Sequence, residues 1–203
     1  MDNIEKELEA GRAVILPTET VYGIFAKALD QEAVDYIYEL KRRPRDKALN
    51  LNVADEKTIR IYSKNQPSYL TKLIHSFLPG PLTIILQANE KVPNWIHSGL
   101  DTVGFRIPAH PKTLDLIRKF GPLVGPSANL SGYASGTKYR AIVSEFDQVV
   151  PGIEDDDFLT GQDSTILDIS SSKSRILRQG SITKADLLAQ VPELSFEEDE
   201  LPQ

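Results

Sequence analysis

Apolar residues near the start of the chain follow first a helical and then a strand-like spacing. Ile4 and Leu8 lie four residues apart and are followed by Gly11, which predicts a short first helix that ends at the glycine. The next apolar residues are consecutive, from residue 13 to residue 16, and predict a buried strand that ends at Pro17. A helix followed by a buried strand is typical of an α/β protein.

The rest of the chain alternates between the same two periodicities. Residues 32–41 place apolar side chains on one side of a helix, and Pro44 disfavours continuation of that helix. Apolar and polar residues alternate from residue 49 to residue 53, as on a strand with one buried face. Together the patterns predict strands at residues 48–53, 82–86, 102–107, 123–124, 148–150, 164–169 and 175–177, and helices at residues 68–78, 113–119, 138–146 and after a Thr183 N-cap.

No internal repeat and no obvious linker interrupts these elements, so one α/β domain is expected. We assign residues 1–190 to this domain and residues 191–203 to an acidic C-terminal tail. The tail contains the run from Phe196 to Glu200, in which four consecutive carboxylates follow the aromatic residue. Like charges at a chain end predict a frayed segment.

Composition narrows the class of protein. With 203 residues, 40% of them hydrophobic, the chain can bury a substantial core. It contains no cysteine, which excludes disulfides, thiolate metal sites and cysteine nucleophiles. The first residues lack the basic-then-apolar order of a signal peptide, and no apolar run approaches the length of a membrane span. These features predict a cytoplasmic protein without membrane contact.

A dense cationic segment lies within this acidic protein. Residues 41–47 contain five cations and one carboxylate and carry a charge of +4, whereas the whole chain carries −6, so the remaining residues carry −10. A small basic cluster on an acidic body favours a polyanion of limited size, such as a nucleoside triphosphate, over a long nucleic acid. A solvated helix C-terminus also favours cations, and the charge pattern alone leaves both interpretations open.

Two segments near strand ends carry polar residues suited to ligand contact. Residues 17–23 add hydroxyls and a carboxylate directly after a buried strand, where open α/β sheets bind ligands, although an ordinary strand-to-helix turn would have the same composition. Strand alternation places Thr102, Gly104 and Arg106 on one face, so the arginine shares its face with a hydroxyl and with a glycine that leaves room for a ligand. A surface ion pair is the alternative role for Arg106.

Two later segments have a similar character. Residues 121–135 offer serines, an asparagine and glycines after a short strand, and their backbone N–H groups could line an anion site. This is no Walker loop, because the G-x-x-x-x-G-K-[ST] pattern is absent from the chain. Residues 163–169 form the last such segment, with Arg178 shortly after. Its serine could simply end a strand, and Arg178 could simply be exposed.

In this order, with the basic cluster between the first two, the segments resemble the YrdC/Sua5 family of threonylcarbamoyl-adenylate synthases. The resemblance extends from about Gly11 to Thr183, and the motifs are specific only in combination. They are PTETVYG at Pro17 to Gly23, KRRPRDKAL at Lys41 to Leu49, PGPLT at Pro79 to Thr83, VGFRIPAHP at Val103 to Pro111, PSANLSG at Pro126 to Gly132, ST at Ser164-Thr165 and LRQGSIT at Leu177 to Thr183.

The resemblance implies a twisted, open, mixed α/β sheet with helices around one basic concave cleft. It also implies an enzyme that condenses L-threonine with bicarbonate and adenylates the product with ATP, accompanied by Mg²⁺, releasing pyrophosphate. The threonylcarbamoyl group then passes to the tRNA threonylcarbamoyl transferase machinery for N6-threonylcarbamoyladenosine modification, and contact with tRNA itself is possible.

The family's site residues carry over position by position. The threonine-binding positions match Thr20, Asn52, Arg106, Gly125 and Ser164. The ATP-binding positions match Arg43, Lys47, Thr102, Ser127, Asn129, Ser135 and Arg178, with Asn129 supporting its loop. Lys41 and Arg43 are the expected catalytic cations, and no side chain is assigned to a metal.

These residue types suit the implied chemistry. An arginine fork is the best side-chain partner for the threonine carboxylate, and Thr20 or Ser164 could meet the hydroxyl. The attacking carbamate and the ATP phosphates are all anions, so Lys41 and Arg43 would lower their repulsion and stabilise the departing pyrophosphate. Since positioning and electrostatics would carry the rate, none of the three histidines is expected to be catalytic; they are His75, His97 and His110.

The chain departs from the family pattern at three positions. Phe25 replaces a usual glycine, Ala48 replaces a usual proline, and Asn52 stands where a histidine is frequent. An amide at position 52 could still hold threonine, but it cannot titrate near neutral pH. The chain also ends soon after the predicted domain, as expected for the short form of the family without an additional C-terminal domain.

Two other classes of function are compatible with parts of the pattern. A double-stranded RNA or tRNA-binding module would show salt-dependent RNA affinity without pyrophosphate release, and the charge of −10 outside the basic cluster argues against it. A carbamoyl-adenylate-forming domain of the hydrogenase-maturation type would share the nucleotide cleft but use carbamoyl phosphate. Such domains normally occur in longer chains with zinc-finger cysteines.

Overall fold

The computed structural model describes residues 2–146 and 150–197. Its strands are short, and most of them are buried on both faces. They are β1 (Val14–Pro17), β2 (Tyr22–Lys27), β3 (Leu51–Asn52), β4 (Ser63–Lys64), β5 (Leu82–Ala88), β6 (Thr102–Arg106), β7 (Leu123–Val124), β8 (Thr165–Asp168) and β9 (Arg175–Arg178).

The strands form one mixed sheet that does not close. Their order is β1-β2-β7-β3-β6-β5-β8-β9, and β4 pairs with β5 beside this path. Two neighbouring pairs are parallel, β3 with β6 and β5 with β8, and the other pairs are antiparallel. This arrangement confirms the expected open, mixed α/β sheet.

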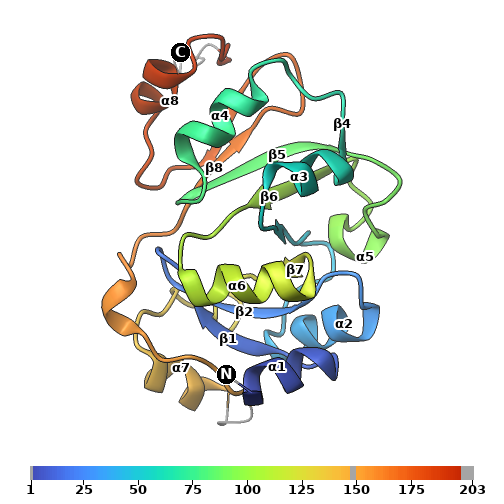
Figure 1. Ribbon diagram of the computed structural model, residues 1–203, viewed down its shortest axis with the longest axis vertical. Helices are drawn as coiled ribbons and strands as arrows, with labels where there is room; N and C mark the ends of the chain where they lie inside the picture. The colour runs from blue at the N-terminus through green and yellow to red at the C-terminus, as the bar shows by residue number, and fades with distance from the viewer. Residues whose placement is uncertain (1, 147–149, 198–203) are drawn as a thin grey trace.

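Helices cover the sheet along its whole length (Figure 1). The first helix lies at one end of the elongated molecule and the last helix at the other. The helices are α1 (Asp2–Glu9), α2 (Gln31–Leu40), α3 (Glu56–Tyr62), α4 (Leu70–Phe77), α5 (Asn94–His97), α6 (Pro111–Phe120), α7 (Tyr139–Glu145) and α8 (Lys184–Gln190), with a 3₁₀ turn η1 (Asp156–Phe158). In the described part of the chain, no helix is both long enough and apolar enough to cross a membrane.

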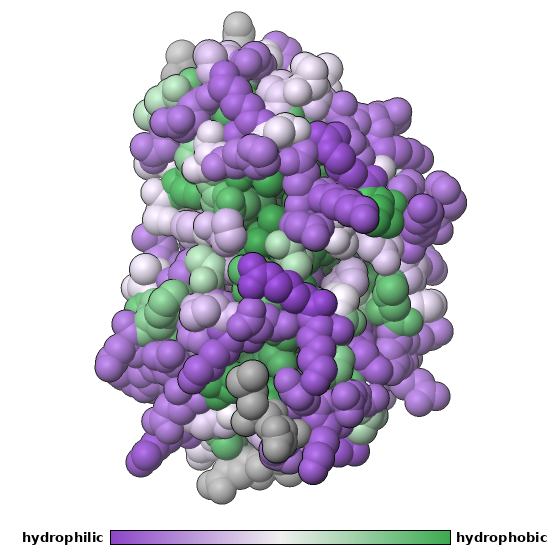
Figure 2. Space-filling model, in the orientation of Figure 1, coloured by the Kyte–Doolittle hydropathy of each residue, from purple (hydrophilic) through white to green (hydrophobic). Residues whose placement is uncertain are grey.

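Two apolar clusters hold the layers together. The smaller joins α1 and α6 to the β1–β2–β7 part of the sheet, through side chains such as Leu8, Phe25, Leu116 and Leu123. The larger includes buried side chains of α2, α4 and α8. The face of the molecule seen in Figure 2 is mostly hydrophilic, with hydrophobic residues visible mainly in recesses between its upper and lower parts.

Strand β2 was not predicted from the sequence. It runs back along β1, with Val14 opposite Phe25 and Pro17 opposite Tyr22. Residues 17–22 therefore form a hairpin connection, and the alternative of a strand-to-helix turn is wrong. Every residue of β2 before Lys27 is buried, so the strand lacks the alternation that marks a half-exposed strand.

Helix α3, strand β4 and helix α5 were also missed, because each is too short for a periodic pattern. The strand predicted at 48–53 shortens to β3. Leu49, Leu51 and Val53 are buried as expected, but Asn52 is buried as well, so the expected single buried face is wrong at this position. The strand predicted at 148–150 falls largely outside the described residues.

The C-terminal segment begins as predicted and ends differently. Thr183 caps α8, with its side chain accepting from the backbone N–H of Asp186 at 3.1 Å while Asp186 accepts from the Thr183 backbone N–H at 2.8 Å. Beyond α8, Leu194 is buried and Phe196 forms a parallel bridge with Ser174. The expectation of a frayed end therefore fails for Phe196, since packing against the sheet outweighs local charge. Residues 198–203 lie outside the described part of the chain.

Candidate active site

One cavity of about 260 Å³ collects residues that are far apart in the sequence. Its lining comes from strands β2, β3, β5, β6, β8 and β9, from the connection between β1 and β2, from the loops that follow α2 and β7, and from the residues just before β8. Seven of the predicted site residues line it: Arg43, Asn52, Arg106, Gly125, Ser127, Ser164 and Arg178.

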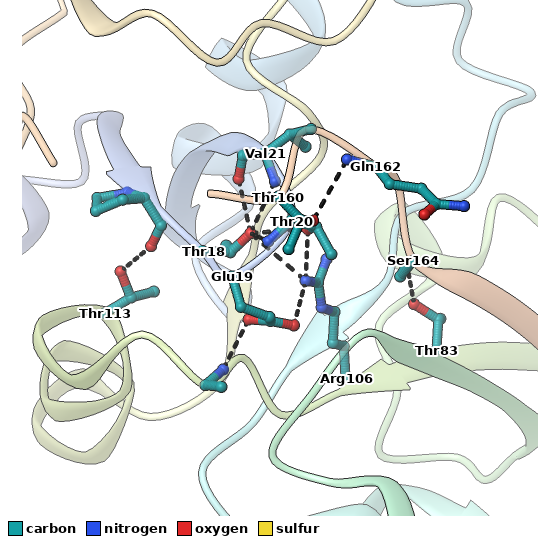
Figure 3. A network of polar contacts seen from close by, with 12 residues as sticks. Thr18, Glu19, Thr20, Val21, Thr83, Arg106, Thr113, Thr160, Gln162 and Ser164 are labelled. Atoms are coloured by element: carbon teal, nitrogen blue, oxygen red, sulfur yellow. Dashed lines mark hydrogen bonds and ion pairs between the residues drawn. The ribbon is translucent and has the colours of Figure 1, made fainter. Parts of the chain in front are cut away.

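Arg106 is anchored at the end of β6 by the hairpin connection between β1 and β2. Its Nη2 donates to Glu19 Oε1 at 2.6 Å and to Thr20 Oγ1 at 2.7 Å (Figure 3). The side chains of Arg106 and Glu19 are only 13% and 14% exposed, so this is a largely buried ion pair and not the surface pair considered above. The buried Nε of Arg106 has no partner among the described residues, so part of the guanidinium remains available to a ligand.

Ser164 and Arg178 form a second polar group beside the first. Arg178 donates from Nε to the Ser164 carbonyl and from Nη2 to the Ser164 hydroxyl, both at 2.9 Å. The Ser164 hydroxyl lies 3.2 Å from that of Thr83, which lines the same cavity. Asp163 stands 3.9 Å from Arg178 and accepts from the Ser135 hydroxyl at 3.2 Å.

Arg106 and Arg178 both line the cavity, and their positive charges repel each other. Burial lowers the pKa of Arg178; Asp163 opposes this shift, and the charge of Arg106 adds to it. Two guanidinium groups that repel each other across a cavity favour an anion between them. The cavity is therefore suited to bind a carboxylate, a phosphate or both.

Glycines and a buried ring shape one wall of the cavity. A Cβ at Gly125 would overlap the ring of Phe25 and would come within 2.8 Å of Asn52 Nδ2. A Cβ at Gly23 would also overlap the Phe25 ring, which is fully buried. Phe25 therefore occupies the space that side chains at both glycine positions would need.

Gly104 does not leave room for a ligand, contrary to the sequence-based expectation. A Cβ at this position would overlap the amide of Asn50 and would lie 3.2 Å from the Thr83 methyl. Asn50 and Thr83 both line the cavity. The glycine accommodates two polar side chains, one from the residue before β3 and one from β5, and these reach the cavity in its place.

Lys41 follows α2 and is only 2% exposed. Its ammonium group donates to the backbone carbonyls of Ser127 and Asn129, and its own carbonyl accepts from the Ser131 N–H at 2.9 Å. Burial lowers the pKa of Lys41 to about 8, the charge of Arg43 adds to this shift, and Glu145 opposes it. Lys41 therefore holds the loop after β7 and does not itself line the cavity.

The rest of the basic cluster divides between the cavity and solvent. Arg43 lines the cavity and donates to the carbonyls of Lys47 at 3.2 Å and Ala48 at 2.8 Å, so it also fixes its own loop. Burial lowers the pKa of Arg43. Arg42 is exposed and has a φ of 50°, and Lys47 is exposed. The interpretation as a uniformly solvated helix end is wrong for Lys41 and Arg43.

Four predicted ATP positions do not line the cavity directly, and one of them is the exposed Lys47. Asn129 supports its loop as expected, because its side chain donates to the carbonyls of Leu130 and Tyr133 at 2.9 Å. Ser135 reaches the cavity only through Asp163. Thr102 begins β6, four residues before Arg106, which corresponds to about 13 Å along a strand.

Several residues of the site were not selected from the sequence, although the quoted motifs contain some of them. Glu19 is the most important, because it accepts from both Arg106 and the backbone N–H of Ala109, the latter at 2.8 Å. Thr18, Asn50, Thr83 and Asp163 line the cavity, but a hydroxyl, amide or carboxylate carries no sequence signal that distinguishes this position from a turn or a surface.

The histidines lie elsewhere. His75 is exposed, and the His97 ring accepts from the Gly99 N–H at 3.2 Å. His110 is buried against Asp155 at 3.2 Å. None of the three lines the cavity, as expected. Within the described residues, no group of three or more histidine, aspartate or glutamate side chains could hold a metal ion.

Comparison with known proteins gives matches over most of the chain. Residues 6–180 match the model of the Sua5/YciO/YrdC family, which carries the description "Telomere recombination". A curated threonylcarbamoyl-AMP synthase from Pyrococcus abyssi is 38% identical over 86% of this chain and 52% of its own length. The threonylcarbamoyl-AMP synthase of Vibrio parahaemolyticus is 32% identical over 89% of this chain and its full length.

A solved structure is similar to this chain in its three-dimensional fold. The crystal structure of P. abyssi Sua5 complexed with L-threonine has a TM-score of 0.89 and 35% identity, covering 96% of this chain and 58% of that one. The chain thus spans about half the length of the first curated relatives that it matches.

Proposed function

The chain belongs to the Sua5/YciO/YrdC family, and from this premise we propose that it is a threonylcarbamoyl-AMP synthase. In the proposed reaction, the amine of L-threonine combines with bicarbonate to form a carbamate and water. A carbamate oxygen then bonds to the α-phosphorus of ATP, the bond to the β-phosphate bridge breaks, and pyrophosphate leaves.

The observation that carries this proposal is the convergence of Arg106 and Arg178 on one cavity, where Arg178 also donates to the Ser164 hydroxyl. The reaction requires an amino-acid carboxylate and a polyphosphate to bind side by side, and both are anions. Two mutually repelling guanidinium groups in a partly buried site are stabilised when such anions bind.

Each group has a role that follows from its contacts. Arg106, held by Glu19 and Thr20, would receive the threonine carboxylate on the part of its guanidinium that lacks a protein partner. Asn52, Gly125 and Ser164 complete this subsite.

Arg43, Ser127 and Arg178 would face the phosphates, where cationic groups stabilise the charge that develops on the α-phosphoryl group and on the leaving pyrophosphate. Lys41 would act through the loop it binds, by fixing the backbone of Ser127 and Asn129. The chemistry then depends on positioning and electrostatics, and it needs no side-chain nucleophile.

Magnesium would enter with ATP. Mg²⁺ is commonly held by substrate phosphates with one or two protein carboxylates, and Asp163 is a carboxylate on the cavity wall next to Arg178. One carboxylate fits a metal that arrives with its nucleotide, and no fuller carboxylate or histidine cluster exists among the described residues. The ion would neutralise phosphate charge when bound.

The product would serve tRNA modification. Threonylcarbamoyl-adenylate is a mixed anhydride, and it is consumed when an acceptor amine reacts with it. Here the acceptor would be the adenosine amine of tRNA, and a transferase would catalyse the transfer. This role supports action in the cytoplasm, where tRNA is available. Direct contact of this chain with tRNA is a separate proposal, tested by salt-dependent binding.

The test is product detection by mass spectrometry after incubation of the protein with ATP, Mg²⁺, bicarbonate and threonine. Threonylcarbamoyl-adenylate and pyrophosphate should both require threonine and bicarbonate. Pyrophosphate release that is unchanged without threonine would refute the proposal, and release that instead requires carbamoyl phosphate would identify the hydrogenase-maturation type of chemistry. Serine should react less well, because one missing methyl typically costs roughly 1–3 kcal/mol.

A pair of variants tests the two subsites. Arg106→Lys keeps the charge beside Glu19 but loses the planar fork, so it should raise KM for threonine by on the order of 10²-fold with little change for ATP. Arg178→Ala should weaken ATP more than threonine. Arg118→Ala is the matched control, since this arginine is 58% exposed on α6. The opposite pattern of substrate effects would mean that the subsites are exchanged.

A further inference from the structure

A segment outside the cavity lining, residues 150–162, connects α7 with β8, and we call it the strap. Figure 1 shows it in orange along one side of the molecule. Its first part pairs with β1, because Ile15 donates to the Pro151 carbonyl at 2.9 Å and Ile153 donates to the Ile15 carbonyl at 3.0 Å. The strap therefore pairs with β1, the strand that leads into the hairpin connection that binds Arg106.

The far end of the strap binds that hairpin connection directly. The backbone N–H of Thr160 donates to the Glu19 carbonyl at 3.0 Å, and that of Gly161 donates to the Thr20 carbonyl at 2.8 Å. The side chains of Glu19 and Thr20 accept the two shorter hydrogen bonds of Arg106 Nη2 (Figure 3). Backbone contacts from the strap thus fix the residues that orient the arginine.

A buried histidine connects the strap to the segment after β6, which also binds Glu19. His110 is 1% exposed, its Nε2 lies 3.2 Å from Asp155 Oδ2 in the strap, and its ring meets Phe158 edge-on at a centroid distance of 4.6 Å. The residue before it, Ala109, donates its backbone N–H to Glu19 Oε2 at 2.8 Å. The contacts therefore close a ring from Glu19 through Ala109 and His110 to the strap and back to Glu19.

We infer that His110 is a positioning residue for the amino-acid subsite: its contact with Asp155 fixes the strap, which in turn fixes Glu19 and Thr20 and so the direction of Arg106. The inference rests on the proposed function for the identity of the ligand, threonine, whereas the effect on the strap does not depend on it. His110 touches neither the cavity nor its ligands, so it acts only through these contacts.

The contacts of the strap also predict which substrate should bind less well when the strap is loosened. The strap contacts the hairpin connection on the Arg106 side, whereas Arg43 and Ser127 are held by the loops after α2 and β7. Loosening the strap should therefore affect threonine and leave ATP largely unchanged. Misplacement of a positioning group by about 1 Å can cost on the order of 10²-fold, so a partial loosening should cost about 10-fold.

The experiment uses Asp155→Ala as the main variant, because Asp155 is 38% exposed and its removal leaves the core intact. His110→Leu removes the donor from the buried side, and His110→Gln restores an N–H at a similar reach. His75→Gln is the matched control, on a histidine that is 69% exposed. Two readouts are needed: amide hydrogen exchange at Thr160 and Gly161 without substrates, and KM for threonine and for ATP in pyrophosphate release.

The expected result is faster exchange at both amides in Asp155→Ala and His110→Leu, with KM for threonine raised about 10-fold and KM for ATP changed less than about twofold. His110→Gln should recover most of both effects, and His75→Gln should change neither. Unchanged exchange in Asp155→Ala, or equal losses for the two substrates, would overturn the inference. If the unaltered protein releases no pyrophosphate with threonine, the proposed function fails, and the exchange data then decide the inference on their own.

Discussion

The buried ammonium group of Lys41 makes the stability of this protein depend on pH in a direction that the structure determines. Burial lowers the pKa of Lys41 from 10.5 to about 8, whereas in the unfolded chain the side chain is exposed and keeps its ordinary value. Between these two values the unfolded chain binds the additional proton, so the free energy of unfolding rises as the pH rises. We consider Lys41→Met, which keeps the length of the side chain and removes its titration.

The size of the effect follows from the two pKa values. The full difference corresponds to about 3 kcal/mol, and the part released between pH 7 and pH 9.5 is about 2 kcal/mol. Deprotonation does not release the loop, because a neutral amine still has two N–H groups for the carbonyls of Ser127 and Asn129. The gain therefore reflects removal of a desolvated charge while the hydrogen bonds persist.

The measurement is urea unfolding of both proteins at pH 7 and at pH 9.5. The unaltered protein should gain about 2 kcal/mol more than Lys41→Met, a difference of about 1 M in the urea midpoint for a typical slope of about 2 kcal/mol/M. Up to pH 9.5 the buried Tyr22 does not titrate in the folded protein, because burial raises its pKa. The contributions of other titrating groups are the same in both proteins and cancel in the comparison. Equal gains in the two proteins would refute the assignment of a depressed pKa to Lys41.

Three further predictions concern stability. Arg42→Gly should stabilise the fold by about 0.5–1 kcal/mol, because the arginine has a φ of 50° that glycine adopts without strain; an unchanged melting temperature would contradict this. Thr183→Ala should cost about 1 kcal/mol in urea unfolding, since it removes the cap that the N–H of Asp186 uses, and Thr183→Ser should restore most of it. Gly125→Ala should cost about 1–3 kcal/mol through overlap with Phe25, and a double-mutant cycle with Phe25→Leu should recover part of the loss; strictly additive effects would show that the ring is not the obstacle.

Elements with a long periodic pattern could be predicted from the sequence, and continuous or short ones could not. Helices α2, α4 and α6 each bury one face, so their spacing was visible. Strand β2 is buried on both faces, and its run of apolar residues after residues 17–21 has no alternation to mark it. Without β2, residues 17–22 could not be recognised as a hairpin connection beneath Arg106.

For the site, the amino-acid sequence established which residue types are present and, through its motifs, which family they resemble. Arg43, Arg106, Ser164 and Arg178 were all selected in this way, and all line the cavity. Residue type and order are enough to select these residues. The cations and hydroxyls of a fixed series of motifs indicate which chemistry a site can perform, whatever its exact shape.

The contacts that hold those groups became visible only in the folded protein. It placed Lys41 beneath a loop instead of at the cavity, filled the space at Gly104 with Asn50, and gave Arg106 a buried carboxylate partner in Glu19. Each of these contacts joins residues brought together by the pairing of strands and loops distant in sequence. Burial and the distances between charges therefore arise from the sheet order, and the spacing of residues along the chain contains no information on either.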